Sequence, residues 1–85
     1  MFKFSKQIAR TDIGTHMIST IKVNGYYETA IWMLPEHAEG NIVVVAQYSN
    51  RKDALEGHQA QVENCERVRP KMLWDINEKK NIELK

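Results

Sequence analysis

Cysteine is nearly absent from this sequence, since Cys65 is the single one among 85 residues. One cysteine cannot form an internal disulfide, and it leaves no CxxC redox motif and no cysteine-rich zinc site. The sequence therefore favours a reducing compartment, and we expect a cytoplasmic protein.

Glycine is also sparse, and the four glycines are isolated at positions 14, 25, 40 and 57. Neither GxGxxG nor GxxxxGK[ST] is formed, so the sequence indicates no backbone cradle for phosphate groups. Nucleotide-dependent chemistry has no support, and we expect no cofactor.

An excess of charge of one sign and long apolar runs are missing too. Twelve Lys and Arg against eleven Asp and Glu give a net charge of +1, too little to attract nucleic acid or an anionic membrane by bulk field.

No window approaches the ~20 apolar residues of a membrane span. Charged residues interrupt the apolar ones at the start of the sequence, unlike a secretory signal. The composition, with 42% hydrophobic and 27% charged residues, predicts one small domain over residues 1–85.

A β-hairpin is predicted around Asn24-Gly25, the dipeptide typical of a two-residue type I′ turn. The flanking runs, 16–23 and 26–34, are rich in β-branched and aromatic residues. Both faces carry apolar side chains, so the pattern does not decide which face is buried. The turn predicts these opposite pairs: Val23 and Tyr26, Ile21 and Glu28, Thr20 and Thr29, Ser19 and Ala30, and Met17 and Trp32.

A third strand is predicted over 42–48, after a loop over 35–41 that contains Pro, Gly and Asn. Apolar side chains of this strand point to both faces, with Val43 on one and Val44 on the other. One helix covers one face of a sheet, so the terminal segments or a partner subunit must cover the second. We expect a homodimer, because exposed apolar faces are commonly used for association.

A helix is predicted over about 51–68, between the N-cap candidate Asn50 and Pro70, which stops it. Asp53 suits the positive end of the helix dipole. At about 100° per residue, an arc of roughly 140° forms a core-facing stripe. The stripe comprises Ala54, Leu55, His58, Gln61, Val62, Cys65 and Val68.

The segment after the predicted helix is apolar over 72–76 (MLWDI) and then charged, with a weak alternation at Ile82 and Leu84. We expect a clamp over the core followed by a short edge strand or a frayed tail. The predicted fold class is α+β, with a small antiparallel sheet of three or slightly more strands packed by one long helix.

His58 lies in the middle of the helical stripe, where a polar ring is costly unless it is hydrogen-bonded. One interpretation is a general base or a ligand; the interpretation that we favour is a buried polar network with Glu28, Thr29 or Tyr48 of the sheet. Cys65 is about 10 Å further along the helix, too far to act as a nucleophile with His58. We assign no catalytic residue and expect no enzymatic activity.

Other polar clusters point to no defined chemistry. Glu36, His37 and Glu39 offer metal donors but lack a fourth ligand at a recognisable spacing, so we interpret them as a solvated turn and assign no metal site. Five basic residues flank the predicted helix: Arg51, Lys52, Arg67, Arg69 and Lys71. The first two lie beside free backbone N–H groups, which suggests contact with an anion.

These basic residues define an alternative function. With the hairpin aromatics Tyr26, Tyr27 and Trp32 as stacking platforms, they would suit a single-stranded nucleic acid. The net charge near zero argues against this alternative.

Short motifs over 26–62 give a resemblance to a group of small, uncharacterised proteins from tailed bacteriophages. The motifs are Tyr27-Glu28-Thr29 in a strand, Tyr48-Ser49-Asn50 at the end of the next, and Asp53-Ala54 with Gly57-His58 in the helix. The resemblance implies a phage or prophage origin and no known activity. Physically the pattern is typical of packing, in which Gly57 removes a side chain near a neighbouring element and His58 bonds across to a strand.

The function predicted from these observations is a phage-type accessory protein in the cytoplasm of a bacterial host. We expect it to bind another protein, of the host or the phage, or a second copy of itself, without catalysis. The alternative is a small nucleic-acid-binding protein that uses the five basic residues. No association with a membrane is expected.

Overall fold

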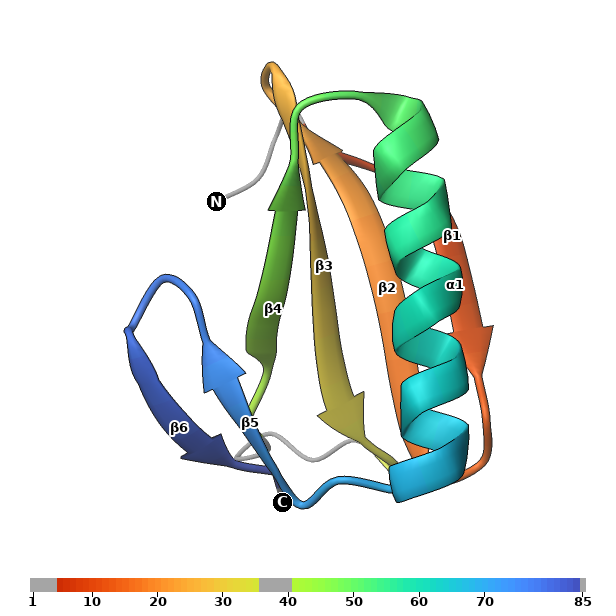
Figure 1. The fold of residues 1–85 in the computed structure, drawn as a ribbon, viewed down its shortest axis with the longest axis vertical. Coiled ribbons are helices and arrows are strands. Elements are labelled where there is room, and N and C mark those ends of the chain that lie inside the picture. Colours follow the sequence, from red (N-terminus) through yellow and green to blue (C-terminus); the bar gives the residue numbers. More distant parts are fainter. Residues whose placement is uncertain (1–4, 36–40, 85) are drawn as a thin grey trace.

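The structure, a computed structural model, describes residues 5–35 and 41–84. Within these residues an antiparallel sheet in the order β1-β2-β3-β4 carries one helix, α1, across one face, and β5 and β6 form a separate two-stranded sheet beside β4 (Figure 1). The fold is α+β, as predicted. The elements are β1 (Ser5–Asp12), β2 (His16–Val23), β3 (Tyr26–Met33), β4 (Val43–Tyr48), α1 (Arg51–Val68), β5 (Met72–Asp75) and β6 (Lys80–Glu83).

The hairpin of β2 and β3 has the register that its turn predicts. Val23 pairs with Tyr26, Thr20 with Thr29 and Met17 with Trp32. Asn24 and Gly25 both have positive φ, 30° and 100°, as a type I′ turn requires. The local turn chemistry therefore fixes the alignment of the two central strands.

β1 is an edge strand that the sequence does not indicate. It pairs with β2 along its length, with a bulge between Gln7 and Ala9. The bulge breaks the period of two on which a strand prediction rests, and charged residues such as Lys6 and Arg10 interrupt the apolar positions. The sheet is thus one strand larger than the hairpin and third strand alone.

α1 has the bounds that its caps predict. The Asn50 side chain accepts a hydrogen bond from the backbone N–H of Asp53 at 2.8 Å, and the helix ends at Arg69 in the left-handed conformation with φ 52°. The predicted stripe is wider than the buried face, because Leu55 and Val68 are 39% and 52% exposed. The buried residues of α1 are Ala54, His58, Val62 and Cys65.

The core lies between α1 and the sheet. Ile18 and Ile31 form a cross-strand pair, are fully buried and face the helix. The face of the hairpin that carries them is therefore the buried one, which the sequence alone does not decide. Val43 of β4 completes this layer. By alternation, Ser19, Glu28, Ala30 and Trp32 point to the opposite face of the sheet.

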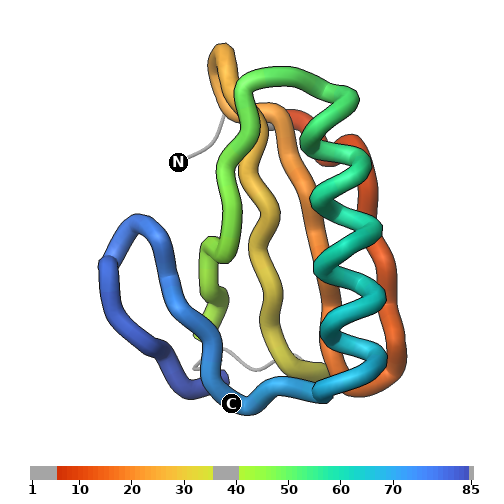
Figure 2. Tube along the Cα trace, in the orientation of Figure 1, coloured from red at the N-terminus to blue at the C-terminus, as the bar shows by residue number. Residues whose placement is uncertain are grey.

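β5 and β6 close one end of the core beside β4 (Figure 2). Leu73 and Ile82, a cross-strand pair, pack against the core, and Leu84 is 2% exposed. Of the predicted clamp over 72–76, Leu73 packs against the core, whereas Met72 and Trp74 are 56% and 53% exposed, so this prediction is confirmed only in part. The segment continues into the strand β6 rather than a frayed tail. Most of the predicted loop over 35–41, with Glu36, His37 and Glu39, lies outside the described residues.

Candidate functional site

His58 belongs to a buried cluster of hydroxyl groups between α1 and the sheet. Its Nδ1 lies 2.8 Å from Thr20 Oγ1, and its Nε2 lies 2.9 Å from Thr11 Oγ1. Thr20 Oγ1 lies 2.6 Å from Thr29 Oγ1, so the cluster extends across the two central strands. Burial lowers the pKa of His58 and favours the neutral ring. Both ring nitrogens are engaged, so this histidine anchors the helix to the sheet.

The partners of His58 differ from those that the sequence suggests. Glu28 is on the other face of the sheet, where its carboxylate accepts a hydrogen bond from the Gln47 amide at 3.2 Å. Tyr48 packs against Gly57, the residue directly before His58, and burial raises the pKa of its hydroxyl. Thr11, which completes the cluster, comes from β1, the strand that the sequence does not indicate.

The predicted basic residues do not form one patch. Arg51 and Lys52 lie in the first turn of α1, and Arg67 lies in its last turn, about 24 Å from Arg51 along the helix. Lys52 pairs with Glu56 at 3.2 Å. Arg69 Nη1 donates to Thr15 Oγ1 at 2.7 Å and to the carbonyl of Ile13 at 3.2 Å, so it ties the helix end to the β1–β2 turn. Lys71 follows beyond the helix and is exposed.

The three hairpin aromatics are also apart. Tyr27 shares the helix side of β3 with Thr29, whereas Tyr26 and Trp32 alternate to the other side and lie about 20 Å apart along the strand. Lys22 lies over the Tyr27 ring at 6.0 Å. A continuous stacking platform is therefore not formed.

The face of the sheet away from α1 contains a cavity of about 230 Å³, which we call the sheet pocket. The helix α1 crosses the opposite face of the sheet (Figure 1). Ser19 and Glu28 are 6% and 8% exposed at its base, whereas Ile42 is 58% exposed at its rim. The residues of the sheet pocket are Ser19, Ile21, Glu28, Ala30, Trp32, Ile42 and Val44.

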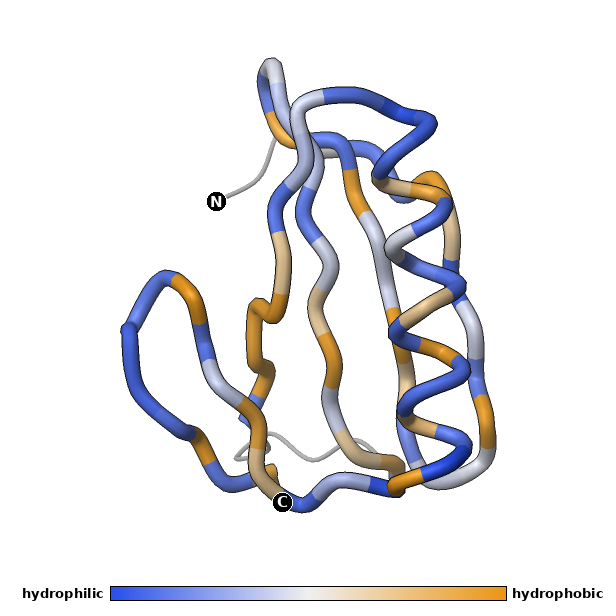
Figure 3. Tube along the Cα trace, viewed as in Figure 1, coloured by the Kyte–Doolittle hydropathy of each residue, from blue (hydrophilic) through white to orange (hydrophobic). Residues whose placement is uncertain are grey.

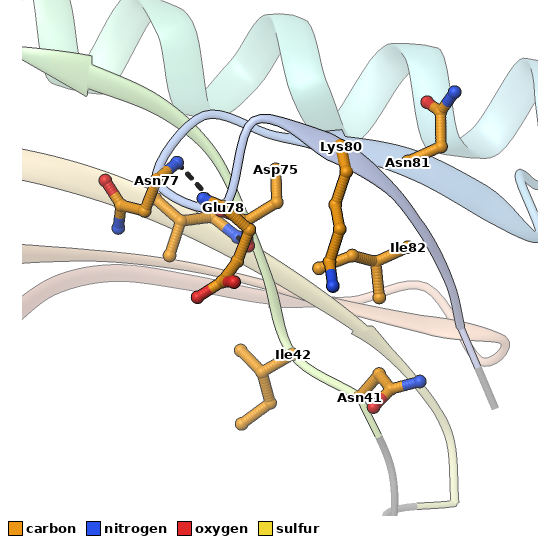
Figure 4. A pocket seen from close by; sticks show the side chains of 9 residues that line it. Asn41, Ile42, Asp75, Asn77, Glu78, Lys80, Asn81 and Ile82 are labelled. Carbon is orange, nitrogen blue, oxygen red and sulfur yellow. Dashed lines mark hydrogen bonds between the residues drawn. The ribbon is translucent and has the colours of Figure 1, made fainter.

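A second, more open depression of about 600 Å³ adjoins the sheet pocket (Figure 4). We call it the hairpin cleft, because the hairpin of β5 and β6 lines one side of it. Lys80 and Ile82 face Ile42 and Asn41 across it, and Ile42 and Val44 line both depressions. The two form one concave surface along β4, whose first half is among the most apolar parts of the chain (Figure 3). Its remaining residues are Asp75, Asn77, Glu78 and Asn81.

Asp75 holds the hairpin cleft in shape. Its Oδ2 accepts a hydrogen bond from Val44 N at 3.0 Å, and its Oδ1 accepts from Asn77 N and Glu78 N, each at 2.8 Å. Burial raises the pKa of Asp75, but the three backbone donors, with Lys80 nearby, outweigh it and hold the pKa below the ordinary value. The sequence Asp75-Ile76-Asn77-Glu78 is a local signal for this turn. The contact of Asp75 with β4 is visible only in the structure.

Trp32 Nε1 is the one buried side-chain nitrogen or oxygen without a hydrogen-bond partner among the described residues. No group of three or more potential metal ligands occurs in the described part of the chain.

Cys65 is buried in the core, where burial raises the pKa of the thiol and Arg69 acts in the opposite direction. The described residues include no helix of the length and apolarity that a bilayer crossing needs.

The fold and the concave surface thus define a small α+β protein with its candidate site on the helix-free face of the sheet. No family model, no curated protein and no solved structure matches the chain.

Proposed function

We propose that the protein is a non-enzymatic interaction module that binds another protein through the sheet pocket and the adjoining hairpin cleft. The observation that carries this proposal is the concave apolar surface on the helix-free face, where Ile42 is 58% exposed and lines both depressions together with Val44. Exposed apolar surface of this kind is commonly covered by a binding partner. The solitary Cys65 fits a reducing compartment, and we place the protein in the cytoplasm of a bacterial host as a phage-type accessory protein.

The experiment compares two matched variants in an affinity pull-down from bacterial lysate, with and without nuclease. Ile42→Arg adds a long charged side chain at the exposed rim shared by both depressions, and Leu55→Arg makes the same kind of change on the helix. We expect a specific protein to be retained by the wild type and by Leu55→Arg, with at least tenfold less on Ile42→Arg.

Equal retention by both variants would contradict the proposed surface. Loss of the retained protein on nuclease treatment would instead favour the nucleic-acid alternative. Sedimentation velocity of the same three proteins tests whether the bound partner is a second copy of the chain.

A further inference from the structure

Glu28 is a carboxylate that is buried with little compensation. It is 8% exposed, and one amide N–H of Gln47, at 3.2 Å, is its hydrogen-bond donor. Among the described residues, no Lys, Arg or His forms an ion pair with it. A carboxylate accepts several hydrogen bonds, and burying it is costly unless it is paired. The sheet pocket therefore presents an acceptor suited to a cation.

Trp32 lines the other end of the sheet pocket. Its indole N–H is buried and has no hydrogen-bond partner among the described residues, so the indole contributes an apolar wall. Glu28 and Trp32 are four residues apart on β3, which places them about 13 Å apart along one face. This span corresponds to about four residues of extended chain.

The walls between these two groups are apolar. Ile21, Ala30 and Val44 line the sheet pocket between Glu28 and Trp32. The methylene groups of a lysine or arginine side chain can lie along such walls while the charged end stays with an acceptor. An acidic side chain would meet repulsion from Glu28, and a purely apolar one would leave the carboxylate unpaired.

We propose that the sheet pocket binds a lysine or arginine side chain presented by an extended segment of the partner protein. The cation pairs with the Glu28 carboxylate, and apolar side chains of the same segment lie along the Trp32 end of the sheet pocket. This inference rests on the proposed function and names the chemistry of its partner.

The test uses a library of random heptapeptides displayed on phage and selected against the full-length chain. We expect lysine or arginine to be enriched at one position among apolar residues. The selected peptide is then measured by fluorescence anisotropy against Glu28→Gln, which keeps the shape and removes the charge, and against Glu78→Gln, which removes an exposed charge in the hairpin cleft.

We expect Glu28→Gln to weaken binding about thirtyfold or more, because the cation loses its buried partner, and Glu78→Gln to have little effect. Replacing the selected arginine by citrulline, or the lysine by norleucine, should remove the difference between the wild type and Glu28→Gln. Circular dichroism checks that each variant is folded.

Two outcomes would overturn the inference, and they differ in what they say of the proposed function. Peptides that lose binding on Ile42→Arg but show no basic enrichment, or are insensitive to Glu28→Gln, would refute the basic side chain and keep the interaction surface. Selection of no peptide sensitive to Ile42→Arg, together with no partner in the pull-down, would refute both.

Discussion

Gly57 and Tyr48 meet where α1 crosses β4. A Cβ atom at position 57 would collide with the hydroxyl and ring of Tyr48, so the glycine makes room for the phenol. Glycine in a helix interior costs about 0.5–1 kcal/mol relative to alanine. The close contact with Tyr48 explains why this cost is tolerated, and it fits the packing role that the sequence motif suggests.

We therefore expect Gly57→Ala to have opposite effects on the free energy of unfolding in the wild type and in the variant Tyr48→Ala. In the wild type we expect it to lower the free energy of unfolding by about 1–2 kcal/mol, because the clash outweighs the gain in helix propensity. In Tyr48→Ala the clash is gone, and Gly57→Ala should stabilise by about 0.5–1 kcal/mol. Urea denaturation of the four proteins measures both effects, and equal effects in the two backgrounds would show that the contact is not tight.

At the scale of the elements, β4 receives its outer partner from the turn between β5 and β6. Ile76 N donates to Val44 O at 2.9 Å, and Asp75 accepts from Val44 N, so this turn satisfies both backbone groups of one edge residue. An edge strand with free backbone groups invites pairing with other chains. The Asp75 contact thus protects part of β4 and also shapes the hairpin cleft.

We expect Asp75→Ala to release β5 and β6 from β4. The substitution leaves three backbone N–H groups without their acceptor and should cost about 2–4 kcal/mol. Hydrogen exchange followed by mass spectrometry should show loss of protection over residues 72–83 that exceeds the loss in β2 and β3. Glu78→Ala, which removes an exposed carboxylate from the same turn, is the control and should change little. A uniform loss of protection would instead mean that the hairpin of β5 and β6 unfolds only with the whole molecule.

Elements with a local sequence signal are predictable, whereas elements that depend on distant partners are not. The Asn24-Gly25 turn and the cap at Asn50 act over a few residues, and they predict the hairpin register and the bounds of α1. β1 pairs without such a local signal and contains a bulge, and β5 and β6 are short strands stabilised by contacts with β4 and the core. Their formation depends on partners distant in sequence, which a periodic pattern does not reveal.

At the scale of the whole molecule, two groups with a lowered pKa, His58 and Asp75, make stability depend on pH in the acid range. His58 has a pKa below its ordinary value of 6.5 in the folded protein, because burial disfavours the charged ring. Asp75 has a pKa below its ordinary value of 3.8. In both cases the unfolded chain binds a proton more readily than the folded one, so acid favours unfolding.

We expect the free energy of unfolding to decrease as the pH falls below 6.5, where His58 is protonated in the unfolded chain, and to decrease again below 3.8 through Asp75. Denaturation curves at pH 7.5, 5.5 and 3.5 measure this dependence. His58→Gln should be less stable at pH 7.5 by about 1–3 kcal/mol, because the hydroxyl cluster loses its ring partner, and should lose less between pH 7.5 and 5.5. An unchanged pH dependence in this variant would contradict the role assigned to His58.

The sequence by itself determined the α+β class, the register of β2 and β3, and the span of α1, because turn residues, caps and the helical period act locally. It also indicated that His58 is buried and that one helix leaves a face of the sheet uncovered. Only the tertiary structure decided which face that is, because Ile18 and Ile31 bury against α1 while Glu28 and Trp32 point away. The sheet pocket adds Ile42 and Val44 from another strand, and Thr11 reaches His58 from β1. These contacts join residues far apart in the chain, and they form only when the strands pair and the helix packs on one side.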